Sequence, residues 1–217
     1  MFLWLQRFLR PHRTVPITPW TASSRWDISV KRTLILFLGL FIFGLGDSLL
    51  IQSQIGNAPW SVLAQGVSER LEITLGWSTF LVSSLVLFLW IPLRERPGFG
   101  TLSNIVVIAV AIQLGITFFP QQIVFWISLV YCLIGIAMVG VGSALYITCG
   151  LGSGPRDGLM TAIHFRSGYR IGRVRLSIEA FVLILGGTVG LGTLLFAALI
   201  GQSIAIALGV VARVTSQ

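Results

Sequence analysis

Five ionisable residues lie where the surrounding sequence is apolar, and they are the first candidates for chemistry. Asp47 interrupts a long run that has no other charge, Arg156 and Asp157 adjoin in a glycine-rich segment, and Glu179 follows Arg175 by four positions. If the run around Asp47 crosses a membrane, a carboxylate at its centre costs about 2.5–3.5 kcal/mol and requires protonation, a partner or water. Asp47 therefore has either a proton- or ion-coupled role or a structural one, in a pair or at the membrane interface.

The other four residues are expected to form one group. Arg175 and Glu179 share a helix face at a spacing of four and can pair. Asp157 suits the first turn of a helix, whose N-terminus carries partial positive charge. With Arg156, these residues predict either a functional charge cluster on the cytoplasmic side or an ion-pair network that fixes a connector.

The sequence lacks the residue combinations that catalysis requires. It has no Ser-His-Asp set in an aqueous setting and no spacing typical of metal ligands. Its two cysteines, Cys132 and Cys149, fall in one apolar run, where a structural disulfide is not expected. We therefore predict no catalytic residues, no metal, no cofactor and no enzyme activity.

Two breaks rich in glycine and proline interrupt the apolar sequence, and each precedes a short helical pattern. Their prolines suit the first helical position, where a missing N–H costs nothing. Inside a membrane, such a break survives only beside protein or water, and two helix N-termini there can build a substrate site near the midplane. The alternative is a pair of surface connectors with glycines in tight turns. The residues predicted to line a substrate path are Asp47, Gly56, Asn57, Pro59, Trp60, Gly152, Gly154, Pro155, Arg156, Asp157, Arg175 and Glu179.

The composition identifies lipid as the solvent for most of the chain. Of 217 residues, 55% are hydrophobic and 10% are charged, against about 25% charged in soluble domains. The net charge of +8 comes from basic residues between the apolar runs, a pattern that sets membrane orientation and argues against nucleic-acid binding. Trp60 and Trp77 are expected to anchor the protein at the membrane interface.

The apolar pattern predicts an all-α transmembrane bundle of about six spans and two short helices that re-enter the membrane or lie at its surface. A basic leader, residues 1–32, is expected to be a mostly mobile tail, with an alternative interfacial helix over residues 2–9. Repeat 1 covers residues 33–119 and repeat 2 covers residues 120–217. The expected spans are 34–53, 75–93, 101–119, 124–149, 174–185 and 193–211, and the short helices are 59–71 and 155–165.

The two repeats are inferred from self-similarity. When residues 44–76 are shifted by 96 onto 140–172, nine of 33 positions are identical, whereas composition alone would give about three. The segment 98–102 also matches 190–194 after a four-residue deletion.

The distribution of charge favours inverted halves over parallel ones. If the short helices re-enter, Arg94, Arg96 and the basic segment 156–175 face the cytoplasm, together with both termini. The uncharged turns near Pro120 and Gly190 then face outside. If the short helices span instead, Arg94 and Arg96 face outside, against the usual bias.

At its breaks the chain resembles the YczE/YyaS/YitT-type bacterial membrane proteins, in particular the YczE-like branch. The resemblance covers about residues 31–211. Family members often have an acid after the first Pro-Trp, where this chain has Ser61. The resemblance implies an integral membrane protein and supplies no catalytic residues. It rests on the segments 56–60, 152–160 and 186–193 and on Val174, Arg175, Ile178 and Glu179.

The sequence therefore favours a transporter or permease for a small molecule in the bacterial inner membrane, working by alternating access. The alternative is a non-transporting scaffold or accessory factor for a partner protein. The expected partners are the lipid bilayer and a small-molecule substrate, without nucleic acid, and a homo-oligomer is compatible with the sequence.

Overall fold

The computed structural model describes residues 14–184 and 186–215, except for the side chains of residues 171, 172 and 175. The described residues form eight helices and no strand, so the all-α prediction is confirmed. The helices are α2 (Val30–Gln52), α3 (Pro59–Leu71), α4 (Leu75–Phe88), α5 (Phe99–Phe118), α6 (Phe125–Thr148), α7 (Pro155–Ser167), α8 (Ile171–Ile184) and α9 (Leu191–Thr215).

Four of these helices, α2, α5, α6 and α9, are long and apolar enough to cross a membrane. The helices α3 and α4 meet at an angle of 115° and count as a fifth span if the bent pair is taken as one. The expected span over residues 75–93 is shorter than predicted, because α4 ends at Phe88 and rises only about 21 Å. Pro92 lies just beyond this end, and a proline disfavours helical backbone at the residue before it. After the turn Trp90 is buried, and its indole N–H donates to the carbonyl of Pro155 over 3.0 Å.

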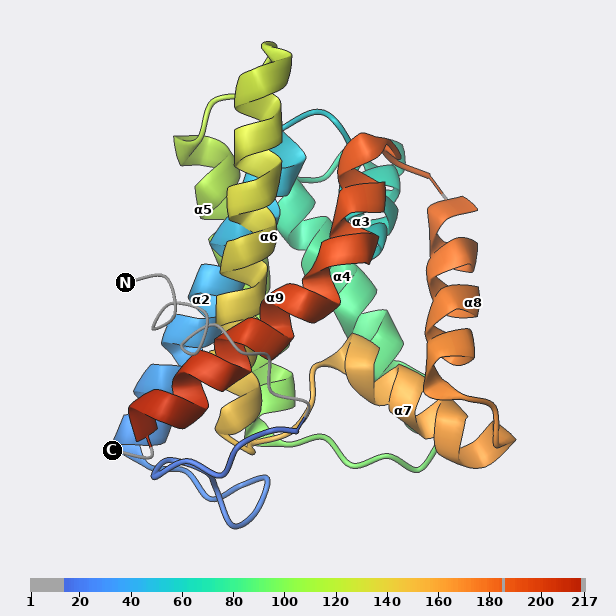
Figure 1. The fold of residues 1–217 in the computed structure, drawn as a ribbon. Coiled ribbons are helices and arrows are strands. Elements are labelled where there is room, and N and C mark those ends of the chain that lie inside the picture. The colour runs from blue at the N-terminus through green and yellow to red at the C-terminus, as the bar shows by residue number, and fades with distance from the viewer. Residues whose placement is uncertain (1–13, 185, 216–217) are drawn as a thin grey trace.

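The helices α2 and α6 run antiparallel and cross closely at the centre of the bundle (Figure 1). Glycines make this approach possible. A Cβ added at Gly142 would lie 2.5 Å from the carbonyl oxygen of Gly39, and a Cβ at Gly46 would lie 2.8 Å from the carbonyl oxygen of Gly135. Small residues let membrane helices approach until their backbones touch. Larger side chains at these two crossings would force α2 and α6 apart.

The remaining helices pack around α2 and α6 in two matching sets. The helix α5 packs on α2 as α9 packs on α6, and α3 packs on α8 as α7 packs on α4. One pair breaks the match, because α4 packs against α5 whereas α8 and α9 lack comparable packing among the described residues. Figure 1 shows α7 at the end of the bundle where α2 begins and α9 ends, and α3 at the opposite end.

The short helices begin as the sequence predicts. Pro59 and Pro155 occupy the first turns, and the preceding Gly56 and Gly152 have φ of 123° and 113°. This left-handed backbone strongly favours glycine. The first helix has the predicted bounds. The second extends two residues further, to Ser167, and the left-handed Gly168 follows as its C-cap. The breaks are therefore encoded locally, by the residue types that each backbone conformation requires.

The described part of the leader packs against the bundle, so the expectation of a mostly mobile tail is wrong for residues 14–29. The Ala22 N–H donates to the carbonyl of Cys149 over 2.9 Å, and the Phe99 N–H donates to the carbonyl of Arg25 over 3.1 Å. Arg32 forms an ion pair with Asp27 at 2.6 Å. Hydrogen bonds from Ser23, together with Arg32, hold the pKa of Asp27 below its ordinary value. The alternative helix over residues 2–9 lies outside the described residues.

Candidate functional site

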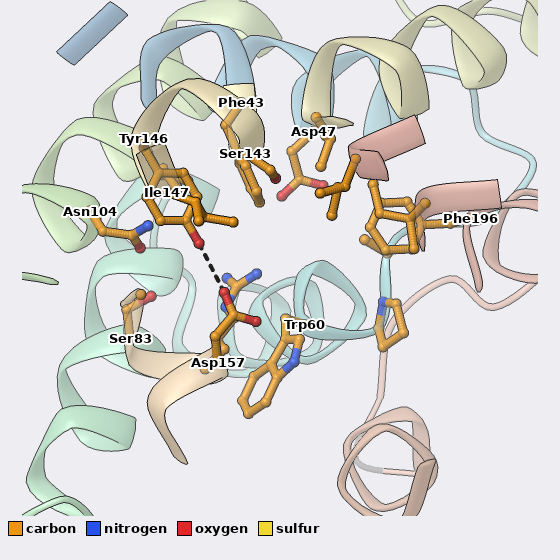
Figure 2. Close-up of a pocket in the computed structure, with 18 of the residues that line it drawn as sticks. Phe43, Asp47, Trp60, Ser83, Asn104, Ser143, Tyr146, Ile147, Asp157 and Phe196 are labelled. Atoms are coloured by element: carbon orange, nitrogen blue, oxygen red, sulfur yellow. Dashed lines mark hydrogen bonds between the residues drawn. The ribbon is translucent and has the colours of Figure 1, made fainter. Parts of the chain in front are cut away.

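A cavity of about 180 Å³ lies between α2, α3, α6 and α7, with further walls from α4, α5, α8 and α9 (Figure 2). Residues of both breaks reach it, from the first turns of α3 and α7. Its walls are mainly apolar, with aromatic rings on several sides. The polar side chains that line the cavity are Asp47, Ser83, Asn104, Ser143, Tyr146, Arg156, Asp157 and Glu179.

Asp47 is the most deeply placed of these groups, with 1% of its surface exposed. The hydroxyl of Ser61 donates to Asp47 Oδ2 over 2.7 Å. Asp47 Oδ1 is buried and has no hydrogen-bond partner. A buried acceptor without a partner costs free energy, and the cost is larger when the group is charged. Figure 2 shows the carboxylate on the cavity wall beside Ser143.

Arg156 and Asp157 enter the cavity from the first turn of α7. The Arg156 guanidinium lies over the Trp60 ring, 5.4 Å from its centroid. The Tyr146 hydroxyl donates to Asp157 Oδ2 over 2.9 Å, the contact drawn as a dashed line in Figure 2. Arg156 interacts electrostatically with Asp47 and Asp157. It lines the cavity together with both of them, but within the described residues it forms an ion pair with neither.

Seven of the twelve residues predicted for the substrate path line this cavity, and they come from both breaks and from two other helices. They are Asp47, Pro59, Trp60, Gly154, Arg156, Asp157 and Glu179. Four others, Gly56, Asn57, Gly152 and Pro155, lie in the breaks without lining the cavity. The predicted pairing of Glu179 with Arg175 lies outside the described residues, because the Arg175 side chain is not among them. The expected interface position is wrong for Trp60, which is 7% exposed, whereas Trp77 is 63% exposed.

The first break is held by the start of α9. The Gly192 N–H donates to the carbonyl of Ile55 over 2.8 Å, and the Thr193 hydroxyl donates to the carbonyl of Asn57 over 2.8 Å. The side chain of Asn57 is buried and donates to Gln65 over 2.7 Å. Asn57 thus helps to fix the break that places Trp60 and Ser61.

The second break is held in the same way by the start of α5. The Gly100 N–H donates to the carbonyl of Leu151 over 2.8 Å, and the Thr101 hydroxyl donates to the carbonyl of Ser153 over 2.8 Å. These two hydrogen bonds are equivalent to those of the first break. The acceptor residues in the two breaks are 96 positions apart, and the donor residues at the starts of α5 and α9 are 92 positions apart. Each break is therefore held by a helix of the other half of the chain. Both sets of hydrogen bonds position helix starts that line the same cavity.

Comparison with known proteins shows to which protein family this chain belongs. Residues 30–208 match the model described as "Family of unknown function (DUF6198)". The chain belongs to this family. Its membership agrees with the expected likeness to YczE-like and YyaS-like proteins, which is confirmed.

Three relatives are similar over most of their length. An "Uncharacterized protein" of Haemophilus influenzae is 43% identical, over 93% of this chain and 94% of the relative. The "Uncharacterized membrane protein YczE" of Bacillus subtilis is 33% identical, over 79% and 83% of the two chains, and "Uncharacterized protein YyaS" of the same organism is 30% identical, over 81% and 92%. No solved structure matches this chain. With its apolar helices, the chain is an integral membrane protein.

Several residues of the site were not predicted, and only some had a signal in the sequence. Under the 96-residue offset, Ser83 and Ser143 occupy the positions equivalent to Glu179 and Asp47. That offset could have identified them. Tyr146 had no such signal, because its equivalent is an apolar Leu50. The residues not predicted are Ser61, Ser83, Asn104, Ser143 and Tyr146. Among the described residues, no group of three His, Cys, Asp or Glu side chains is placed to hold a metal ion.

Proposed function

We propose that this protein is a transporter of the bacterial cytoplasmic membrane that moves a small molecule by alternating access. The observation that carries the proposal is the shared cavity, to which both breaks contribute their first helical turns beside the buried Asp47. Discontinuous helices that meet near the midplane are a common way for transporters to build a substrate site. The proposal assigns binding and movement to the cavity, and no chemical conversion.

The proposed architecture is an inverted repeat of two halves, residues 33–119 and 120–217. Its support comes from three kinds of equivalence. The helices α7 and α8 have the bounds of α3 and α4 shifted by 96 residues. The two glycine contacts between α2 and α6 are also equivalent. A shift by 96 residues places Gly39 and Gly46 on Gly135 and Gly142, so each contact is replaced by the other. The hydrogen bonds that the start of α9 donates to the first break are likewise equivalent to those that the start of α5 donates to the second break.

Support for alternating access comes from a difference in helix packing between the two halves. The helix α4 packs against α5, but the equivalent helices α8 and α9 do not pack comparably. The two repeats have equivalent sequences but adopt different conformations in this structure. If each repeat takes the conformation of the other, the protein reaches its second state, with the cavity open to the opposite side of the membrane. In that second state α8 packs against α9, and α4 separates from α5.

The proposed topology has six crossings, with α3–α4 and α7–α8 as bent crossings and both termini in the cytoplasm. The start of α2 and the end of α9 lie at the same end of the bundle in Figure 1, as an even number of crossings requires. The basic residues of the α7–α8 connector lie at this end, in agreement with the usual cytoplasmic bias.

A cysteine-labelling experiment tests this topology. Gln121, between α5 and α6, and Ser167, the last residue of α7, are both exposed. Figure 1 shows the α5–α6 connection and α7 at opposite ends of the bundle. An impermeant thiol reagent should label Gln121→Cys in intact cells, and Ser167→Cys only after the membrane is permeabilised. The native Cys132 and Cys149 are buried and provide an unreactive background. Labelling of both variants in intact cells, or the reverse pattern, contradicts the proposed orientation.

The transport role is tested with the purified wild-type chain beside Asp157→Asn. A thermal-shift screen against a metabolite library should find a ligand that stabilises the wild type and stabilises the variant less. Reconstituted vesicles should then accumulate that ligand only when they contain the wild-type protein. A scaffold for a partner protein would instead tolerate the Asp157 change and would neither bind nor move a small molecule.

A further inference from the structure

We propose that the cavity binds a small zwitterion of the α-amino-acid type, with its ammonium group at Asp47 and its carboxylate at Arg156 between the starts of α3 and α7. This inference rests on the proposed function and names the class of its substrate. It is carried by Asp47 Oδ1 and by the guanidinium of Arg156, for which the described residues provide no hydrogen-bond partner.

The ammonium subsite is defined by Asp47. Ser61 satisfies one oxygen of this carboxylate, and the other oxygen is buried at the cavity without a partner. A charged N–H donor from a ligand would satisfy it with a short, charge-assisted hydrogen bond. Asp157 also lines the cavity, as a second carboxylate that favours a positively charged group on the ligand. It already accepts a hydrogen bond from the Tyr146 hydroxyl.

The carboxylate subsite is defined by Arg156. Its guanidinium has five N–H donors in a planar fork that matches a carboxylate. Within the described residues it forms no hydrogen bond or ion pair, and its contact is with the face of the Trp60 ring. Stacking on an aromatic ring fixes the guanidinium plane and leaves its edge available for a ligand.

Two helix N-termini reinforce the carboxylate subsite. The N-cap residues of α3 and α7, Ala58 and Gly154, both line the cavity, and neither caps its helix with a side chain. The first residues, Pro59 and Pro155, have no N–H, and the Ser61 N–H donates to the carbonyl of Ala58. The contribution of these ends is therefore their partial positive charge, which favours an anion.

Separated charges select for a ligand that carries both. Asp47 and Arg156 lie on one cavity but form no ion pair, so only a ligand with both charges can form a direct ion pair with each of them. The volume of about 180 Å³ is below the range of about 300–1,000 Å³ that is typical of drug-sized ligands. Phe43, Ile147 and Phe196 provide an apolar wall for a short side chain.

The test uses three forms of the same compounds with the purified full-length chain in lipid nanodiscs. The probes are L-alanine, L-valine and L-leucine, their methyl esters, which keep only the positive charge, and their N-acetyl derivatives, which keep only the negative charge. We expect at least one free amino acid to bind at least ten times more tightly than its ester and its N-acetyl form, measured by calorimetry. Equal binding of either single-charge form, or no binding by any free amino acid, overturns the zwitterion.

Two variants separate the subsites. Asp47→Asn should abolish the preference for the free amino acid over the N-acetyl form, and Arg156→Gln should abolish the preference over the ester. Arg166→Gln, an exposed change on the same helix, should leave both preferences intact. If both cavity variants keep the wild-type preferences, the assignment of the subsites is overturned.

The same probes distinguish a failure of this inference from a failure of the proposed function. Amino acids that bind selectively but do not accumulate in proteoliposomes would retain the zwitterion site and contradict transport. Accumulation of another solute, without selective binding of the free amino acids, would retain transport and contradict the zwitterion site.

Discussion

Replacing Asp47 by Asn should lower the affinity for the transported molecule about 10- to 100-fold, without lowering the amount of folded protein in the membrane. The side chain keeps its size and keeps an oxygen for the Ser61 hydroxyl, but it loses the charge presented to the cavity. Hydrogen bonds to charged groups contribute about 1.5–3 kcal/mol, which corresponds to this range of affinity. Concentration-dependent uptake into proteoliposomes measures the effect.

Glu69→Gln is the matched control for this variant. It also replaces one acid by its amide, but Glu69 is exposed near the end of α3 and does not line the cavity. The hydrogen bond that Gln65 donates to Glu69 can be made to an amide oxygen as well. Uptake by this control should match the wild type. Wild-type uptake by Asp47→Asn would show that the carboxylate has no part in transport.

The second large effect is on stability, at the crossing of α2 and α6. In Gly142→Ala the new Cβ would lie 2.5 Å from the carbonyl oxygen of Gly39 and 2.6 Å from the backbone nitrogen of Phe43. Both atoms belong to the backbone, so α2 must move as a whole. Overpacking of this kind typically costs about 1–3 kcal/mol. The melting temperature of the purified protein should fall by several degrees.

Gly201→Ala is the control for the crossing. It makes the same change within a helix, but no atom lies within 4 Å of the added Cβ. An alanine in a helix interior is favoured over glycine by about 1 kcal/mol, so this variant should be as stable as the wild type or more stable. Equal melting temperatures for the two variants would mean that α2 and α6 do not approach as closely as described.

The elements that follow from local sequence could be predicted well. The bounds of α3 follow from Pro59 at its start and from the glycine-containing break before it. The all-helical character follows from apolar runs that only lipid can cover. The end of α4 also has a local signal, Pro92, which the expected span over residues 75–93 passed over. By contrast, the hydrogen bond from Trp90 to the carbonyl of Pro155 joins residues 65 positions apart. Periodicity over a short window carries no information about such a contact.

The candidate site was predictable to the extent that its residues are charged or break helices. Asp47, Arg156 and Asp157 stand out because they are ionisable in apolar surroundings. Tyr146 does not stand out, because a tyrosine in an apolar helix resembles any core residue until its hydroxyl is seen at Asp157. Trp60 was expected at the membrane interface, where tryptophan is common. Its position in the sequence gives no sign of the contact between its ring and the Arg156 guanidinium.

The central claim is that two inverted halves exchange conformations around one cavity. Spin labels at equivalent positions test it directly by pulsed electron paramagnetic resonance in bilayers. One protein carries labels at Leu85 and Leu102, on α4 and α5, and a second carries them at Phe181 and Leu194, on α8 and α9, all of them exposed.

We expect two distances between the labels in each protein, with the opposite balance of short and long distances in the two proteins. When the α4–α5 pair is mostly short, the α8–α9 pair should be mostly long, and a bound ligand should shift both populations in opposite directions. A single distance in each protein, unchanged by lipid or ligand, would describe a rigid protein and would contradict alternating access.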